Sequence, residues 1–273
     1  MNVDKRKLGY TRDSEEFRTN TQRLAQFAEA VGDTNPDHRS GRVAPPVFHH
    51  LPVMQSMVEV LKEVSNGFLI HGEQDFAYHQ AIVPGQRLRS RSSLVGMRNS
   101  SAGVLILVRS ETHDHGGEPV CTQRATCLVQ GQHIAEELGE AHPARPTVPR
   151  DGVPEVSAFQ IDDQQTLRYA EAARDYSPYT LDAAAAKALG LPAPIVHGMC
   201  TLALIARSVV DRACEGNTRR LRRLGCRFSH PLYVKPGQEL RTRLWSAPGT
   251  VAFEAEDREG NLVVKNGFAE VAS

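Results

Sequence analysis

The apolar positions of the chain form two series, and each is typical of a long helix followed by strands. In the first half, apolar residues recur at four- and three-residue steps, which is the spacing of one helix face. Pro45 and Pro46 stand where this helix can begin, and Asn66-Gly67 stands where it can end. The apolar positions of the face are Val47, Leu51, Met54, Val58 and Leu61.

Strand-like runs follow this helix, separated by turn signals such as Pro84-Gly85. They cover residues 68–79, 86–97, 104–113 and 119–130. The second half has a helix face at Leu202, Ile205 and Val209, and strands near 219–228, 238–245, 251–257 and 262–271. Because a helix with such an apolar stripe must be covered, we expect a sheet to wrap around each one.

The two series belong to an internal repeat. FAEAVGDTNPDH (27–38) matches YAEAARDYSPYT (169–180) at an offset of 142 residues, and PGQ follows in both halves. A proline-rich stretch, HPARPTVPRDGVP (142–154), lies between the copies and is typical of a linker. We therefore predict a first unit over 1–141, a linker over 142–156 and a second unit over 157–273.

The first copy holds the residues with the clearest chemistry. In GDTNPDH, a helix from about Thr21 should end near Gly32, because Asn-Pro favours a turn. The loop beyond it can bring Asp33 and His38 to one point, where a carboxylate and an imidazole form an acid–base pair. A helix cap explains the same spacing and, on spacing alone, is favoured. The duplicated context and the apolar helix that follows raise the catalytic interpretation.

GDTNPDH resembles the G-D-x-N-P-x-H signature of the MaoC-like, type 2 (R-specific) enoyl-CoA hydratases. The second half is similar to the same family through RDYSPYT and PIVHGMCT. The resemblance covers nearly the whole chain and implies an α+β double hot-dog fold. Two tandem units would each wrap an antiparallel sheet around a long central helix. It also implies reversible hydration of a 2-enoyl-CoA thioester, with no cofactor and no metal.

The resemblance gives roles to residues of the first half. Asp33 and His38 match the pair that holds the reacting water, and Asn35 matches the asparagine that supports the loop. In the family, a backbone N–H at the start of the central helix binds the thioester oxygen. His49 occupies that position in the first half and Gly198 in the second.

The second copy departs from the family pattern. Asp175 is kept, but Ser177 replaces the asparagine and Thr180 replaces the histidine. We therefore assign the chemistry to the first half and expect the second half, with Gly198 and His197, to supply the substrate-binding cleft. The alternative is that Asp175 works with another histidine, such as His197.

The short loop HRSGRV (38–43) places Arg39 and Arg42 beside the predicted site. Arginine suits carboxylate and phosphate recognition, although loop arginines are also common on surfaces. The functional interpretation is a short dicarboxylic substrate such as itaconyl-CoA or mesaconyl-C4-CoA, giving citramalyl-CoA. Two alternatives are a 3-hydroxyacyl-thioester dehydratase of fatty-acid or polyketide synthesis and a non-catalytic acyl-thioester binding protein.

Composition sets the partners and the compartment that we expect. The 32 basic and 32 acidic residues balance to zero charge, which argues against nucleic acid as a partner. The chain has no run of eighteen apolar residues and no apolar segment near its start, so we predict neither a membrane span nor a secretory signal. Five cysteines without a CxxC spacing favour reduced thiols. We expect a cytoplasmic homodimer that binds an acyl-CoA substrate.

Overall fold

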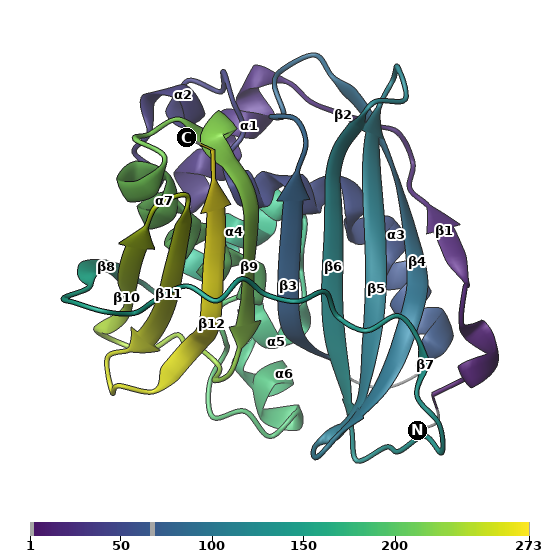
Figure 1. The fold of residues 1–273 in the computed structure, drawn as a ribbon. Helices are drawn as coiled ribbons and strands as arrows, with labels where there is room; N and C mark the ends of the chain where they lie inside the picture. Colours follow the sequence, from purple (N-terminus) through teal and green to yellow (C-terminus); the bar gives the residue numbers. More distant parts are fainter. Residues whose placement is uncertain (1–2, 66–68, 273) are drawn as a thin grey trace.

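The computed structural model describes residues 3–65 and 69–272, and its strands form one antiparallel sheet with the helices on one side (Figure 1). The strand order along the sheet is β1-β4-β5-β6-β3-β9-β12-β11-β10-β8, and β2 and β7 pair with β4. The first half contributes β1 (Thr11–Asp13), β2 (Phe17–Arg18), β3 (Ile70–Tyr78), β4 (Arg87–Ser100), β5 (Gly103–Asp114), β6 (Pro119–Gln130) and β7 (Leu138–Gly139). The second contributes β8 (Glu155–Ile161), β9 (Leu221–Phe228), β10 (Gln238–Ala247), β11 (Thr250–Asp257) and β12 (Leu262–Val271).

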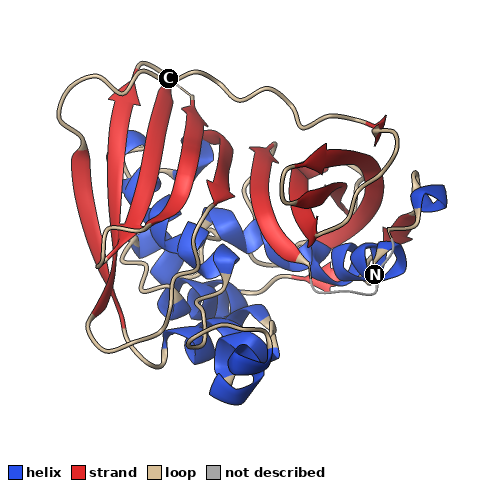
Figure 2. Ribbon diagram, turned by 90° about the horizontal axis from the view of Figure 1, so that it is seen from below, coloured by secondary structure: helices blue, strands red, loops and turns tan. Residues whose placement is uncertain are grey.

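The helices cover the concave face of the curved sheet (Figure 2). They are η1 (Lys5–Lys7), α1 (Thr21–Ala30), α2 (Pro36–Arg39), η2 (Pro46–Val53), α3 (Met54–Val64), α4 (Gln165–Ala173), α5 (Pro178–Leu181), α6 (Ala183–Ala188), α7 (Gly198–Ala213) and η3 (Thr218–Arg220). None of the helices in the described ranges is long and apolar enough to cross a bilayer.

The four strands predicted in each half are confirmed, whereas four others escaped prediction. Of these, β1, β2 and β7 are two or three residues long. β8 begins inside the predicted linker, at Glu155, and is mostly exposed at the edge of the sheet. An exposed edge strand needs no apolar alternation, so the hydrophobic pattern could not reveal it.

The first central helix differs from the single helix that the pattern predicts. It begins as a 3₁₀ helix over Pro46–Val53 and becomes α-helical only at Met54. Pro52 lies inside the 3₁₀ segment, and its ring and missing N–H prevent a regular α-helical turn there. The predicted end at Asn66-Gly67 lies outside the described residues. In the second half, α7 is one unbroken and largely buried helix.

The two halves join in the middle of the sheet and again beneath it. β3 pairs antiparallel with β9, with Gln74 opposite Cys226. Phe27 of α1 and Tyr169 of α4, which the repeat aligns, meet edge to face with ring centroids 5.9 Å apart. The larger apolar core spans both halves around α7, and a smaller core lies between α3 and strands β4 to β6. The buried apolar residues of the described ranges therefore form two separate clusters.

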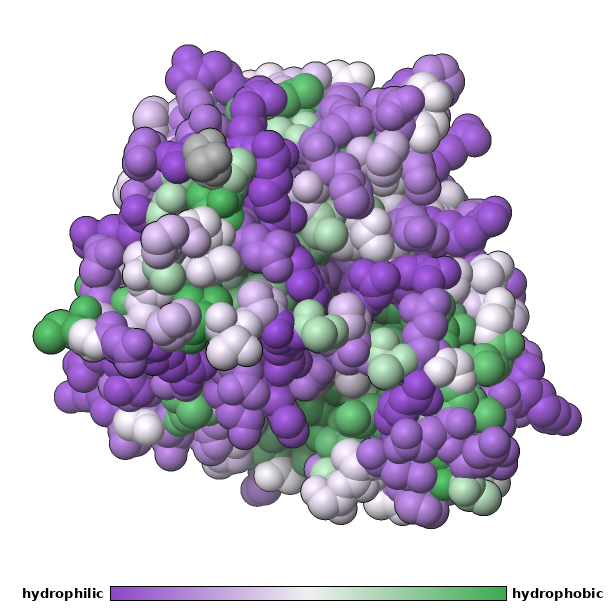
Figure 3. Space-filling model, viewed as in Figure 1, coloured by the Kyte–Doolittle hydropathy of each residue, from purple (hydrophilic) through white to green (hydrophobic). Residues whose placement is uncertain are grey.

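The segment between the halves crosses the outer face of the sheet in an extended conformation (Figure 1). Arg145 pairs with Glu73 of β3 at 2.8 Å, and Arg223 of β9 donates to the carbonyl of Ala144. The face that it crosses is mostly hydrophilic (Figure 3). The linker is therefore fixed by polar contacts to both strands of the β3–β9 junction.

A buried ion pair also ties these two strands together, and it gives a test of the junction. Arg223 donates to both carboxylate oxygens of Asp75, at 3.0 and 2.6 Å, and Asp75 is 3 % exposed. We expect Arg223→Ala to lower the free energy of unfolding by about 3 kcal/mol or more, because it leaves a buried carboxylate unpaired.

The matched control is Arg91→Ala, which breaks the exposed Arg91–Asp13 pair of β4 and β1. It should lower the free energy of unfolding by less than about 1 kcal/mol. Urea titration of both variants and the wild type measures these losses. Equal losses in the two variants would contradict a structural role for the Asp75–Arg223 pair.

Candidate active site

The loop after α1 brings Asp33 and His38 into direct contact. α1 ends in a Schellman turn, in which Gly32 has a φ of 59° and the Asp33 N–H donates to the Ala28 carbonyl at 2.8 Å. The single-turn helix α2 then turns His38 back, so that its Nδ1 lies 2.7 Å from Asp33 Oδ2. His38 is 1 % exposed and Asp33 3 % exposed. The pair predicted from sequence spacing therefore forms, and it is buried.

Asn35 holds this loop and connects it to the second half. Its backbone N–H donates to Asp33 Oδ1, and its side-chain Oδ1 accepts the Asp37 N–H, both at 2.9 Å. Its Nδ2 donates to the carbonyl of Gly216, beyond the end of α7, at 2.7 Å. The asparagine thus caps α2 and also fixes the position of residues from the other copy.

The second half supplies a further contact that sequence reasoning missed. Thr218, the first residue of η3, places its hydroxyl 2.5 Å from His38 Nε2. Both nitrogens of the ring are therefore occupied, one by Asp33 and one by Thr218. The sequence carries no signal for this contact, because Thr218 lies 180 residues from His38 and outside any recognised motif.

Two charged side chains of α7 flank the pair. Arg207 donates to the carbonyl of Val31 at 2.9 Å. Burial lowers the pKa of Arg207, although the negative charges of Asp33 and Asp211 act to raise it. Burial, followed by the charge of Asp33, raises the pKa of Asp211. The C-terminal half of α7 therefore forms one wall of the loop that carries the pair.

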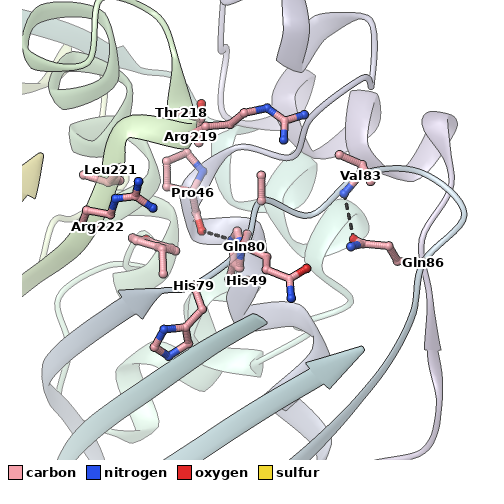
Figure 4. Close-up of a pocket in the computed structure, with 12 residues that line it drawn as sticks. Pro46, His49, His79, Gln80, Val83, Gln86, Thr218, Arg219, Leu221 and Arg222 are labelled. Atoms are coloured by element: carbon pink, nitrogen blue, oxygen red, sulfur yellow. Dashed lines mark hydrogen bonds between the residues drawn. The ribbon is translucent and has the colours of Figure 1, made fainter. Parts of the chain in front are cut away.

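A cavity of about 500 Å³ lies between the halves beside this site (Figure 4). Its lining includes Pro46, His49 and Gln80 from the first half and Thr218, Arg219 and Arg222 from the second. Among the described residues, neither Asp33 nor His38 lines it. Of the described residues that line the cavity, Thr218 is the one that hydrogen-bonds His38.

His49, the predicted position of the oxyanion donor, lies in η2 at the cavity wall. Its ring is held by two carbonyls, with Nδ1 2.9 Å from Pro46 O and Nε2 3.1 Å from Gln80 O. Burial lowers the pKa of His49, although both carbonyls oppose this effect. A neutral ring donates from only one nitrogen, so one of the two contacts lacks a proton at any time.

The second copy keeps the backbone of the motif with different side chains. The Asp175 N–H donates to the Ala170 carbonyl at 3.2 Å, and Arg174 has a positive φ of 57°, close to the 59° of Gly32 in the first copy. His197 Nε2 lies 2.9 Å from the Thr180 hydroxyl and 3.0 Å from the Asp175 carbonyl. Its buried Nδ1 has no hydrogen-bond partner in the described part of the chain.

The structure places the predicted site residues at two separate locations. His197 and Gly198 lie at the start of α7, whereas Asn35 binds Gly216 just beyond its end. Sixteen helical residues separate the two ends, which corresponds to about 24 Å. In the described part of the chain, neither His197 nor Gly198 hydrogen-bonds Asp33 or His38, and His197 contacts Thr180 and the Asp175 carbonyl instead.

The predicted arginines also lie away from the cavity. Arg39 and Arg42 are both exposed, and Arg42 pairs with Asp37 through Nε at 3.0 Å. Arg219 and Arg222 line the cavity instead, and neither forms an ion pair in the ranges that the structure describes. The sequence order gave no indication of this, because β9 reaches the site only through its pairing with β3.

Comparisons with known proteins agree with this architecture. A family model described as MaoC like domain matches residues 139–266, and one described as FAS1-like, dehydratase domain region matches residues 7–123. The second half of the chain is thus similar to MaoC-like domains and the first half to FAS1-like dehydratase regions. These matches and the relatives named below support an enzyme of the hydratase and dehydratase type.

Two relatives match most of the chain. "Probable enoyl-CoA hydratase 2" of Dictyostelium discoideum is 26% identical over 79% of this chain and 76% of its own length. "Enoyl-CoA hydratase 2, peroxisomal" of Arabidopsis thaliana is 23% identical over 86% of this chain and 80% of its own length.

Two solved structures share the fold. A MaoC-like dehydratase from Phytophthora capsici has a TM-score of 0.86 at 24% identity and covers 100% of this chain and 98% of its own. A Mycobacterium tuberculosis protein with a double hot-dog fold has a TM-score of 0.62 at 12% identity, with 96% and 95% covered. The expected α+β double hot-dog is confirmed.

The histidines near Asp175 give a test of the second copy. His50 and His71 come from the first half, and their rings lie 6.4 Å apart. Burial lowers the pKa of both, and it lowers that of His71 to about 4, although Asp175 acts in the opposite direction. His71 also packs against Phe228 of β9.

A lowered pKa of His71 predicts a loss of stability in acid. The unfolded chain binds the proton first as the pH falls below about 6.5, so stability decreases between there and about pH 4. The free energy of unfolding of the wild type should decrease as the pH is lowered from about 7.5 to about 5. In His71→Gln this decrease should be smaller by about 1 to 2 kcal/mol. The exposed His113→Gln is the control, and an unchanged pH dependence in His71→Gln contradicts the assignment.

Proposed function

We propose that this enzyme adds water reversibly to a 2-enoyl-CoA thioester, with Asp33 and His38 of the first half as its acid–base pair. The observation that carries the proposal is the buried Asp33–His38 contact, which faces the cavity through Thr218. The relatives named enoyl-CoA hydratase 2 support the same reaction class.

The geometry suggests how the two groups divide the work. Asp33 accepts hydrogen bonds on both oxygens, from Asn35 N–H and His38 Nδ1, which leaves His38 Nε2 as the nitrogen on the cavity side. In this proposal His38 removes a proton from water, the water oxygen attacks the β-carbon, and a proton returns to the α-carbon on the same face. Asp33 orients the ring and stabilises the imidazolium.

The start of η2 suits the thioester oxygen. Pro46 and His49 line the cavity there, and a helix N-terminus favours negative charge on a nearby oxygen. The aligned position assigns the donor to the backbone N–H of His49. Such a donor stabilises the enolate-like transition state without a metal ion.

The matched positions of the repeat give a direct test of which copy is catalytic. Asp33→Asn and His38→Ala should each lower kcat at least about 100-fold in enoyl-CoA hydration, because they remove the orienting carboxylate and the base. Asp175→Asn changes the equivalent position of the other copy and should stay within about threefold of the wild type. The reverse pattern would assign the chemistry to the second half.

We also propose a short dicarboxylic substrate, such as itaconyl-CoA or mesaconyl-C4-CoA giving citramalyl-CoA. Support comes from unpaired arginines in the cavity, and these are Arg219 and Arg222 rather than Arg39 and Arg42. An arginine without a carboxylate partner of its own can pair with a substrate carboxylate.

Substrate preference tests this assignment. Arg219→Ala or Arg222→Ala should lower kcat/KM for mesaconyl-C4-CoA relative to crotonyl-CoA by about tenfold or more. Arg39→Ala and Arg42→Ala should leave the ratio of the two kcat/KM values unchanged. That result would show that these two arginines do not recognise the substrate carboxylate. An equal fall for both substrates would show that the cavity arginines contact the CoA part instead.

One alternative has a specific observation in its favour. The match of residues 7–123 to a FAS1-like dehydratase region supports the reverse reaction on a 3-hydroxyacyl thioester of fatty-acid or polyketide synthesis. Comparing carrier-protein and CoA thioesters of the same acyl group would separate the two. The homodimer and the cytoplasmic location stay predictions.

A further inference from the structure

Thr218 separates the acid–base pair from the cavity. Its hydroxyl lies 2.5 Å from His38 Nε2, and the same residue lines the cavity. His38 is 1 % exposed and does not line the cavity among the described residues. Among the described residues that line the cavity, Thr218 is the one that hydrogen-bonds His38, so its hydroxyl stands on a direct path between the two.

The position of Thr218 is fixed from both halves of the molecule. Asn35 binds the Gly216 carbonyl at 2.7 Å, and Asn217 caps η3 by accepting the Arg219 N–H at 3.1 Å. Two residues with positive φ, Glu215 at 53° and Gly216 at 75°, shape the turn that leads into it. The loop that holds Asp33 and His38 thus also holds the residue that faces them.

The hydrogen-bond directions suit proton transfer. Asp33 accepts from His38 Nδ1–H, so a neutral ring carries its lone pair on Nε2. The Thr218 hydroxyl then donates to Nε2, and its own lone pairs can accept a proton from a water in the cavity. A hydroxyl can donate and accept a hydrogen bond at once without a change in charge.

We propose that Thr218 relays the proton between His38 and the reacting water, an inference that rests on the hydration proposed above. As the water oxygen bonds to the β-carbon, a water proton passes to Thr218 Oγ1 and the Thr218 proton passes to His38 Nε2. The π electrons move to the thioester enolate. The imidazolium then returns the proton through Thr218 to the α-carbon, which restores the neutral ring and the hydroxyl.

Single-turnover hydration by three variants tests the relay. Thr218→Val keeps the shape but removes the hydroxyl, and it should lower the rate about 100-fold with little change in KM. Thr218→Ser restores the hydroxyl and should recover the rate to within about tenfold of the wild type. Thr180→Val is the matched control, because Thr180 makes the same type of contact with His197 Nε2 at the other end of α7. It should stay within about threefold.

A proton inventory distinguishes a relay from a merely structural role. The rate is measured in mixtures of light and heavy water and plotted against the deuterium fraction. For the wild type this plot should be curved, because two protons move together. For the residual activity of Thr218→Val it should be a straight line. A wild-type or faster rate in Thr218→Val overturns the relay and identifies the hydroxyl as a blocking group. A wild-type enzyme that hydrates no enoyl thioester overturns the proposed function, which is a separate and distinguishable failure.

Discussion

The antiparallel pairing of β3 with β9 is the contact on which the rest of the molecule depends. It merges two sheets into one and brings the start of β9 to the first half. Because η3 directly precedes β9, the same pairing places Thr218 against His38 and Arg222 in the cavity. The site is therefore a product of the fusion, since neither half holds all of its residues.

The two copies show how a duplicated unit can keep its backbone while its chemistry changes. Both loops leave their helix through a positive φ, and both aspartates donate a backbone N–H to the equivalent alanine carbonyl. In the first copy His38 contacts Asp33, whereas in the second Thr180 contacts His197 instead. The second copy contributes to the proposed chemistry through a different element, the segment from Gly216 to Arg222.

The sequence predicted local features well and contacts between the halves poorly. The repeat, the central helices, the main strands and the Asp33–His38 contact all follow from short-range patterns and spacing. Thr218, Arg219 and Arg222 could not be found in this way, because the sheet register brings them to the site. Gly198 and His197 were placed in the same site on motif identity alone. The structure instead gives His197 contacts with Thr180 and the Asp175 carbonyl, which belong to the second copy.

The location of a bound product tests the central claim most directly. We expect a crystal structure with a 3-hydroxyacyl-CoA to show the thioester in the cavity beside Pro46 and His49, with the 3-hydroxyl within about 3.2 Å of Thr218 or His38. A thioester bound instead at Gly198, with its hydroxyl near Asp175 and His197, would contradict the assignment of the chemistry to the first half.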